Sequence, residues 1–510
     1  METFKAQPTR QFKLKTILEC TGVCWAVAAY GYSASIIATT FGQPSFIRAM
    51  CLDTAPNAPD LMGAANALFF VGGFFGCLLN AVLANKVGRK GVIAIGQVIL
   101  CVSTALLAGS VHIGMFIVFR FTAGFGGYMG LMSAPLWVVE VVPPKGRGPL
   151  LDISGIMINL GYVTASWIGV GFFFYEAPHA WRAPLALGCL PPILCLISLC
   201  FVPESPRLLI LQGKSEQAWK IISDLHTVHG NDSLARQEFE QMNKQIQFES
   251  TLRTGWLEIV RRPSYRKRAL MTIGLLFTVV SSGALVINNY ATIIYGSLGY
   301  SPQDQLILQA GWLSTAFVGN FVAVLIVDRI ARPKLISIGL GICLLSLILE
   351  ASFVATYGMS TNKAALGACV AWNYLFVWGF SLFLDGVTWW YAGEIFPTHL
   401  RAHGMAIGMG TYALANMVWL QAAPTAFANI GWKYYLFFII ITFSGMCVIY
   451  FTFPDTLHKP LEEVAKLFGD TDLVVAYQEH GLVTGSDENG SDETQMKQEF
   501  VELQENELVE

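Results

Sequence analysis

Acidic and basic side chains with the same spacing occur at two places in the sequence, each at the end of a long apolar run. The two sets are Glu140, Pro143 and Arg147, and then Glu394, Pro397 and Arg401, 254 positions later (394 minus 140). A carboxylate and a guanidinium can form a bidentate ion pair, and a partly dry network of such pairs stabilises more than an exposed pair does. The repeated spacing indicates an internal duplication of the chain. It favours an ion-pairing role over the alternative, in which these charges only fix the orientation of the chain.

Two further ionisable residues stand inside apolar stretches. Arg120 heads the run that ends at Glu140, and Asp385 stands nine residues before Glu394, or ~13 Å along a helix. A charge inside an apolar helix of membrane length is costly and is a functional hypothesis by default. Asp385 can serve to bind a proton, a cation or a hydroxyl-rich solute. The alternatives are a carboxylate near the outer mouth of the protein, or one paired with a basic group.

Amide and phenol side chains within other apolar runs supply donors and acceptors. The candidates are Asn288, Asn289, Tyr290, Tyr412 and Asn416. A polyhydroxy ligand needs several such groups converging on its hydroxyls, together with aromatic faces against its ring. The alternative is that these asparagines hold neighbouring helices together.

The elements that position these residues are apolar helices. The 510 residues are 54% hydrophobic and 13% charged, about half the charged fraction of a soluble protein. Twelve apolar runs are long enough to cross a bilayer: 17–40, 61–84, 91–110, 114–139, 150–174, 184–202, 269–297, 306–327, 335–357, 365–392, 404–427 and 434–453. Gly124, Gly126 and Gly130 in the fourth run leave room for a neighbouring helix. We therefore predict an all-α integral membrane protein with twelve transmembrane helices and a lipid bilayer around it.

Basic residues predict the orientation of these helices. Lys5, Arg10, Lys13 and Lys15 precede the first run, which places the N-terminus in the cytoplasm. Six runs precede the polar segment, so that segment returns to the same side. The predicted parts are a cytoplasmic N-terminus, two six-helix bundles joined by a cytoplasmic helical linker, and an acidic cytoplasmic tail: 1–16, 17–202, 203–267, 268–453 and 454–510. We expect a multi-pass protein of the plasma membrane.

Signals for catalysis are missing from the sequence. It contains no GxxxxGK[ST] phosphate loop and no His/Cys cluster with metal-site spacing. We expect no enzyme activity, no metal, no cofactor and no nucleic-acid partner. The oligomeric state stays open, and a monomer is compatible with the sequence.

Several motifs, in order along residues 31–463, resemble the sugar porter family of the major facilitator superfamily. The residues in several of them are typical of fungal members. They are Arg120-x-x-x-Gly124-x-Gly126, Pro135 to Glu140, Arg147-Gly148, Trp181-Arg182, Pro203-Glu204-Ser205-Pro206-Arg207, the loops 76–89 and 319–332, and Pro454-Asp455-Thr456 with Leu461-Glu462-Glu463. The resemblance implies the twelve-helix major facilitator fold, in which two bundles rock about a central site. It also implies that Tyr290, Trp389 and Asn416 lie at the substrate, with packing as the alternative for Trp389.

The repeated spacing of the acidic and basic residues favours a gate on the cytoplasmic side. Seven charged residues are expected to form ion pairs across the two halves, for example Glu140 with Arg401 and Glu394 with Arg147. They are Arg89, Glu140, Arg147, Glu204, Arg332, Glu394 and Arg401.

Other positions depart from the family pattern. Ser33 stands where proton-coupled members carry aspartate, so facilitated diffusion is expected. Gly155 replaces the glutamine of the fifth helix, Val279 and Val280 replace a glutamine pair, and Leu285 replaces an asparagine. The usual set of sugar-binding amides is therefore missing.

The best-supported function is transport of a sugar or sugar-like polyhydroxy solute, a small molecule, by alternating access. Because the pocket positions are less polar than usual, the alternative is uptake or export of a quinate-like acid or a more apolar metabolite. A non-transporting nutrient sensor is the alternative from a different class.

Overall fold

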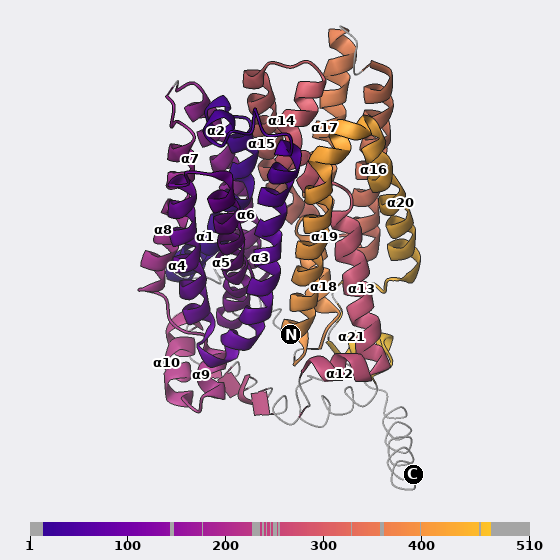
Figure 1. Cartoon of the computed structure of the whole chain (residues 1–510). Coiled ribbons are helices and arrows are strands. Elements are labelled where there is room, and N and C mark those ends of the chain that lie inside the picture. The colour runs from indigo at the N-terminus through magenta and orange to yellow at the C-terminus, as the bar shows by residue number, and fades with distance from the viewer. Residues whose placement is uncertain are drawn as a thin grey trace.

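A computed structural model describes residues 14–470, except 143–146, 176, 227–234, 237–238, 241, 245, 248–251, 253–254, 328, 358–361, 398, 458 and 460. Within these residues the regular structure is entirely helical. The helices form two bundles side by side, coloured indigo to magenta and pink to yellow in Figure 1. The prediction of an all-α protein with two helical bundles is confirmed.

The N-terminal half contains six membrane helices, the sixth built from α7 and α8, and a short α2 that follows the first. Its elements are α1 (Leu14–Phe41), α2 (Pro44–Ala49), α3 (Ala58–Lys86), α4 (Arg89–Ala108), α5 (Ile113–Val141), α6 (Arg147–Phe173), α7 (Arg182–Leu187) and α8 (Leu190–Leu199).

The C-terminal half repeats this arrangement, with its first and fourth membrane helices each built from two pieces. Its elements are α13 (Pro263–Val280), α14 (Ala284–Ser297), α15 (Pro302–Ile326), α16 (Arg332–Tyr357), α17 (Lys363–Phe383), α18 (Val387–Glu394), α19 (Arg401–Asn429), the 3-10 turn η1 (Gly431–Lys433) and α20 (Tyr434–Thr452). Eleven spans in the described residues are long and apolar enough to cross a membrane. The remaining membrane helix, which brings the total to twelve, is the 29-residue α19. It packs along α3 of the other half.

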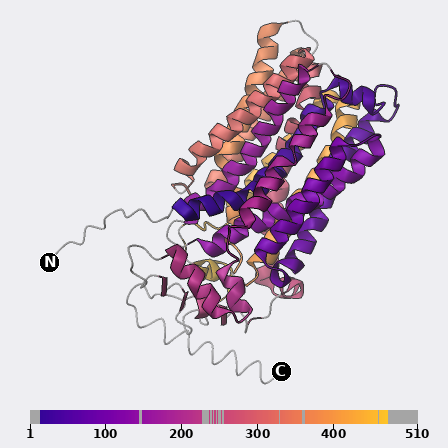
Figure 2. The ribbon, with the colours of Figure 1, turned by 90° about the vertical axis from the view of Figure 1, so that its left-hand side faces the viewer.

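Short helices outside the bundles gather at one end of the molecule, called here the linker end, as Figure 2 shows. They are α9 (Pro206–Leu211), α10 (Ser215–His226), α12 (Trp256–Arg261) and α21 (Leu461–Leu467). After α21, the buried Asp470 accepts hydrogen bonds from Arg268 and Ser264 of α13. Lys15 at the start of α1 pairs with Asp224 of α10 at 2.6 Å. Both ends of the described chain therefore lie at the linker end, as an even number of spans requires.

Three membrane helices are broken, although the sequence predicted continuous runs there. Pro191 and Pro192 open α8, and proline at the start of a helix removes a donor that has no partner in any case. Gly283 takes φ +90 between α13 and α14, a left-handed conformation that favours glycine. Leu384, Asp385 and Gly386 separate α17 from α18. Broken helices of this kind expose backbone and side chains in the middle of a membrane protein, where transporters bind their ligands.

Glycine on α5 lets neighbouring helices approach closely, as the sequence predicted. A Cβ at Gly124 would overlap the carbonyl oxygen of Phe69 on α3, and one at Gly130 would overlap the side-chain amide of Gln97 on α4. Packing of small residues replaces the hydrophobic driving force that is missing between helices in lipid.

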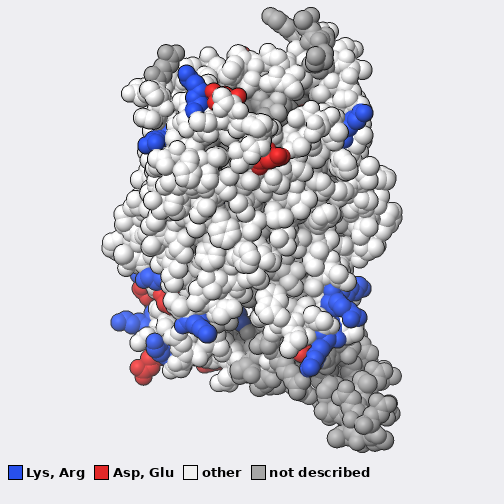
Figure 3. All heavy atoms as spheres, viewed as in Figure 1, with Lys and Arg blue, Asp and Glu red and all other residues white. Residues whose placement is uncertain are grey.

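Charge on the surface follows the membrane assignment. On the face shown in Figure 3, lysine, arginine and acidic side chains gather at the two ends, with a broad uncharged band between them. Exposed apolar side chains of the membrane helices include Phe75, Val98, Val118 and Phe443. A large apolar surface of this kind is stable only in contact with lipid or protein.

Candidate functional site

A cluster of charged and aromatic side chains lies at the linker end of the N-terminal half. The Arg89 guanidinium donates from Nε and Nη2 to Glu140 Oε1, at 3.1 and 2.9 Å. Arg89 Nη1 also donates to the carbonyl of Ala84, five residues earlier. Glu204 accepts from the backbone N–H of Lys90 near the start of α4, and Trp137 donates to the carbonyl of Pro203. We call these residues, Arg89, Trp137, Glu140 and Glu204, the N-cluster.

The C-terminal half repeats the cluster contact by contact. Arg332 Nη2 lies 3.2 Å from Glu394 Oε1, and its Nη1 donates to Val327, again five residues earlier. Asp455 accepts from the backbone N–H that begins α16, and Tyr391 donates to the carbonyl of Pro454. Tyr391 follows Trp137 by the same 254 positions (391 minus 137). We call Arg332, Tyr391, Glu394 and Asp455 the C-cluster, and the duplication inferred from spacing is now visible as duplicated bonding.

Among the described residues, Glu140 and Glu394 each form an ion pair within their own half, whereas pairs across the halves were expected. Glu140 bonds to Arg89, not to Arg401, and Glu394 bonds to Arg332 and to Thr456 Oγ1 at 2.6 Å. Each arginine begins the helix after a short loop, so it reaches the glutamate of its own bundle first. The Arg147 side chain lies outside the described residues, and Arg401 begins α19 at the same end.

The buried Arg120 is bound by carbonyls and an aromatic ring instead of an acid. Its Nη1 donates to the Ser33 carbonyl at 2.7 Å and its Nε to the Ala65 carbonyl at 3.2 Å. The guanidinium carbon lies 4.3 Å from the centre of the Phe69 ring, a cation–π geometry. Among the described residues no carboxylate pairs with it.

Asp385 lies at the break between α17 and α18 and joins the two halves. Its Oδ2 accepts from the amide of Asn159 on α6 at 3.1 Å and from the amide of Asn320 on α15 at 3.0 Å. Asn159 belongs to the N-terminal half, and both asparagines are almost fully buried. Sequence reasoning selected Asp385 but missed both asparagines. The available signal was an amide one helical turn after Gly155 in an otherwise apolar run.

Aromatic side chains stand beside this carboxylate. Trp389, one turn after Asp385 on α18, packs edge to face on Tyr412 of α19 with ring centres 5.1 Å apart. Tyr412 and Tyr162 of α6 lie within electrostatic range of Asp385. Trp389, Tyr412 and Tyr162 are half-buried, so they border space as well as protein. Three of the predicted site residues, Asp385, Trp389 and Tyr412, are thus brought together.

The other predicted site residues are more deeply packed. Asn288 and Asn289 on α14 are 2% exposed, and their side-chain oxygens receive no hydrogen bond from the described residues. Tyr290 donates to the Leu420 carbonyl on α19 at 2.8 Å. Asn416 is 1% exposed and donates to the Tyr412 carbonyl one turn earlier. These four residues shape the C-terminal half around the site, and the two free amide oxygens keep acceptor capacity.

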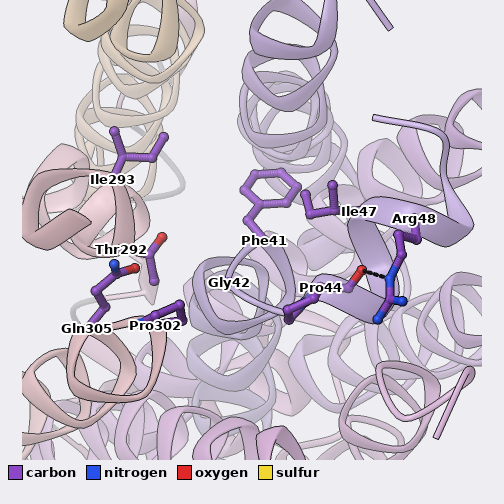
Figure 4. A pocket seen from close by; sticks show the side chains of 9 residues that line it. All are labelled: Phe41, Gly42, Pro44, Ile47, Arg48, Thr292, Ile293, Pro302 and Gln305. Carbon is purple, nitrogen blue, oxygen red and sulfur yellow. Dashed lines mark hydrogen bonds between the residues drawn. The ribbon is translucent and has the colours of Figure 1, made fainter. Parts of the chain in front are cut away.

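The two halves are joined at the end opposite the linker, the far end. Asp60 at the start of α3 accepts from Thr425 near the end of α19 at 3.0 Å. Trp167 of α6 donates to Ser314 of α15 at 3.0 Å. A pocket of about 460 Å³ lies at the same end, and Figure 4 shows it between Phe41, Ile47 and Arg48 on one side and Thr292, Ile293 and Gln305 on the other. Arg48 and Pro44, which line this pocket, are exposed, so the pocket lies at the protein surface.

A second buried acid was missed by the sequence reasoning. Glu350 on α16 is 1% exposed and accepts from Asn373 and from Tyr435, both at 3.2 Å. Both partners belong to the C-terminal half, so this acid ties one bundle together. No group of histidine, cysteine or acidic residues among the described ones could hold a metal ion.

Comparison with known proteins adds a family and a fold. The family described as "Sugar (and other) transporter" matches residues 20–468. The chain is 30% identical to the MFS-type transporter criB of Aspergillus cristatus, with 90% of this chain and 94% of that protein covered. It is 27% identical to the arabinose-proton symporter of Bacillus subtilis, with 86% and 92% covered. The solved structure of the proton:xylose symporter XylE bound to 6-bromo-6-deoxy-D-glucose matches with a TM-score of 0.74 at 21% identity, covering 89% of this chain and 99% of that one.

Proposed function

The chain belongs to the sugar (and other) transporter family, and from this membership we propose that it carries a neutral sugar or polyol by alternating access. It is a membrane transporter and not an enzyme. The observation that carries the proposal is the contact between Asp385 and Asn159, which joins the two halves at the middle of the membrane helices. A solute bound there touches both bundles and is passed from one side to the other as they rock.

The arrangement of the two ends supports this cycle. The far end is held by Asp60 with Thr425 and by Trp167 with Ser314. At the linker end, the ion pairs of the N-cluster and C-cluster close each bundle on itself. We propose that each half moves as a unit when the two bundles rock.

Uptake into liposomes tests the proposed function. Purified protein in liposomes is mixed with a radiolabelled panel of glucose, xylose, arabinose, sorbitol and myo-inositol. Protein-dependent entry of at least one neutral solute is expected, saturating with concentration. A protein that binds a member of the panel, as a raised melting temperature shows, but moves none of them would be a sensor.

We propose that both termini and the linker face the cytoplasm, in the plasma membrane, and that a monomer suffices for transport. Cys51 in the loop between α2 and α3 is exposed at the far end, which makes it a natural reporter. A membrane-impermeant maleimide is expected to label wild-type protein in sealed cells and to leave Cys51→Ser unlabelled. Ser215→Cys, added to Cys51→Ser, is expected to react only after permeabilisation. Reaction of that variant in sealed cells would reverse the orientation.

The two charge clusters are proposed as the gate at the linker end. Glu394→Gln removes the charge that Arg332 and Thr456 bind, so the C-cluster becomes a poorer docking surface when this end closes. We expect turnover to fall only about three- to tenfold, because Glu394 is partly exposed and solvent screening weakens its ion pair. The KM for a transported neutral solute should change less, because Glu394 lies away from the proposed solute site.

Glu140→Gln is the matched change in the other half. Its ion pair is more buried, with 8% and 6% of the Arg89 and Glu140 side chains exposed, so we expect the larger reduction there. Both variants should leave the linker end more reactive to thiol reagents at an introduced cysteine. Unchanged turnover in both variants would show that these charges only fix topology.

A further inference from the structure

The hydrogen-bonding groups that remain free around Asp385 are all acceptors. Each amide of Asn159 and Asn320 donates one hydrogen to Asp385 and the other to the carbonyl one turn earlier on its own helix, Gly155 and Ala316. The hydrogens of both amides are therefore used, since a primary amide has two. Asp385 Oδ1 and the two amide oxygens receive no hydrogen bond from any described residue. What remains is a set of three acceptors without a donor.

Open space lies next to these acceptors. A Cβ built at Gly155 would meet no atom within 4 Å, and one at Gly386 would meet only Trp390 at 3.9 Å. Gly155 is one turn from Asn159 on the same face of α6, and Gly386 is adjacent to Asp385. Trp389, three residues after Gly386, packs edge to face on Tyr412, and both side chains are half-buried.

The charge of the site is uncompensated by protein. Among the described residues no lysine, arginine or histidine lies within ion-pair distance of Asp385, and only the two amides stabilise it. A second negative charge in the same weakly polar space would be repelled and would find no donor. Hydroxyl groups, in contrast, donate to carboxylates in strong charge-assisted hydrogen bonds.

From this arrangement we propose that Asp385, oriented by Asn159 and Asn320, is the hydroxyl-recognition group of the transporter and that it selects neutral polyhydroxy solutes against their carboxylate counterparts. The inference rests on the proposed transport function and specifies which class of solute is transported. Asp385 contacts the solute, and the two asparagines are positioning residues. Asn159 belongs to the N-terminal half and Asp385 to the C-terminal half. The hydrogen bonding of the solute-binding carboxylate therefore changes when the two bundles move relative to each other.

The test pairs each neutral solute with an acid of the same skeleton: glucose with gluconate, and myo-inositol with quinate. In liposomes, wild-type protein is expected to take up its best neutral solute at least tenfold faster than the matching acid. Asp385→Asn is expected to slow neutral uptake at least tenfold, as the loss of a hydrogen bond to a charged group does, and to reduce the preference for neutral solute to less than threefold. Asn159→Ala is expected to raise KM more than it lowers turnover, with partial rescue by Asn159→Gln.

Glu350→Gln is the matched control, because it makes the same change at a buried acid whose partners all lie within one half. It is expected to keep the wild-type preference. Melting curves of each purified variant show whether the protein is folded. Equal wild-type uptake of neutral and acidic partners, or an unchanged preference in a folded Asp385→Asn protein, would overturn the inference while leaving transport intact. If wild-type protein moves none of these solutes, the proposed function fails instead.

Discussion

Replacing Gly124 by leucine is expected to abolish the folded protein. A Cβ at this position would overlap the carbonyl oxygen of Phe69 and lie 2.7 Å from its carbonyl carbon, so α3 and α5 would have to separate. A backbone carbonyl cannot rotate away as a side chain can. Overpacking of ordinary cores costs about 1–3 kcal/mol, and separation of two long helices costs more, out of a net stability of about 5–15 kcal/mol. Size-exclusion chromatography of tagged protein in detergent is expected to show aggregate and little monodisperse peak.

Gly171→Leu on α6 is the control for this change. A Cβ at Gly171 would meet no atom within 4 Å, and the residue is exposed on the bundle surface. The control is expected to give a wild-type profile and wild-type melting temperature. A monodisperse Gly124→Leu protein with normal uptake would show that the α3–α5 contact is looser than the structure indicates.

Local spacing explains why much of the fold was predictable. Apolar runs of membrane length and the glycines of α5 act through the helix that contains them, so the sequence predicts the spans and their close contacts. The repeat from Glu140 to Glu394 is also local, and the duplicated N-cluster and C-cluster confirm it. Partner choice was harder to predict. The pairing of Glu140 with Arg89 depends on the conformation of the short loop between α3 and α4. The spacing of Glu140 and Arg147 gives no information about that loop.

The candidate site was only partly predictable, because it depends on a helix break. The run 365–392 looks continuous in sequence, but α17 ends at Phe383 and α18 begins at Val387. This break lets Asp385 reach Asn159 and Asn320 at once, on helices 226 and 65 positions away. Each asparagine alone looks like a residue that bonds a neighbouring helix. Only the convergence of three helices shows that the amides hold a carboxylate.

The absence of proton-driven accumulation is the second large effect that we expect. In proton symporters of the family that the sequence resembles, an aspartate of the first helix alternates between a protonated state and an ion pair with the arginine at the position of Arg120. Here Ser33 occupies that place, and Arg120 donates to the Ser33 carbonyl instead. Neither a carbonyl nor the Ser33 hydroxyl takes up a proton in the physiological range, so no group at this position can link proton entry to solute binding. In liposomes, labelled solute is therefore expected to reach the outside concentration and stop there, with or without an imposed pH gradient.

The same experiment identifies the coupling group if this expectation is wrong. Uptake above the outside concentration that an uncoupler abolishes would contradict facilitated diffusion. Asp385 would then be the first residue to examine, because it lies between the halves and changes its surroundings when Asn159 moves with the N-terminal bundle. Loss of accumulation in Asp385→Asn, with exchange of labelled for unlabelled solute retained, would assign the coupling to Asp385. Accumulation that survives in Asp385→Asn would require a proton acceptor outside the contact between the two halves. The buried Glu350, which accepts hydrogen bonds from Asn373 and Tyr435, would be the next candidate. Loss of accumulation in Glu350→Gln would then assign the coupling to it.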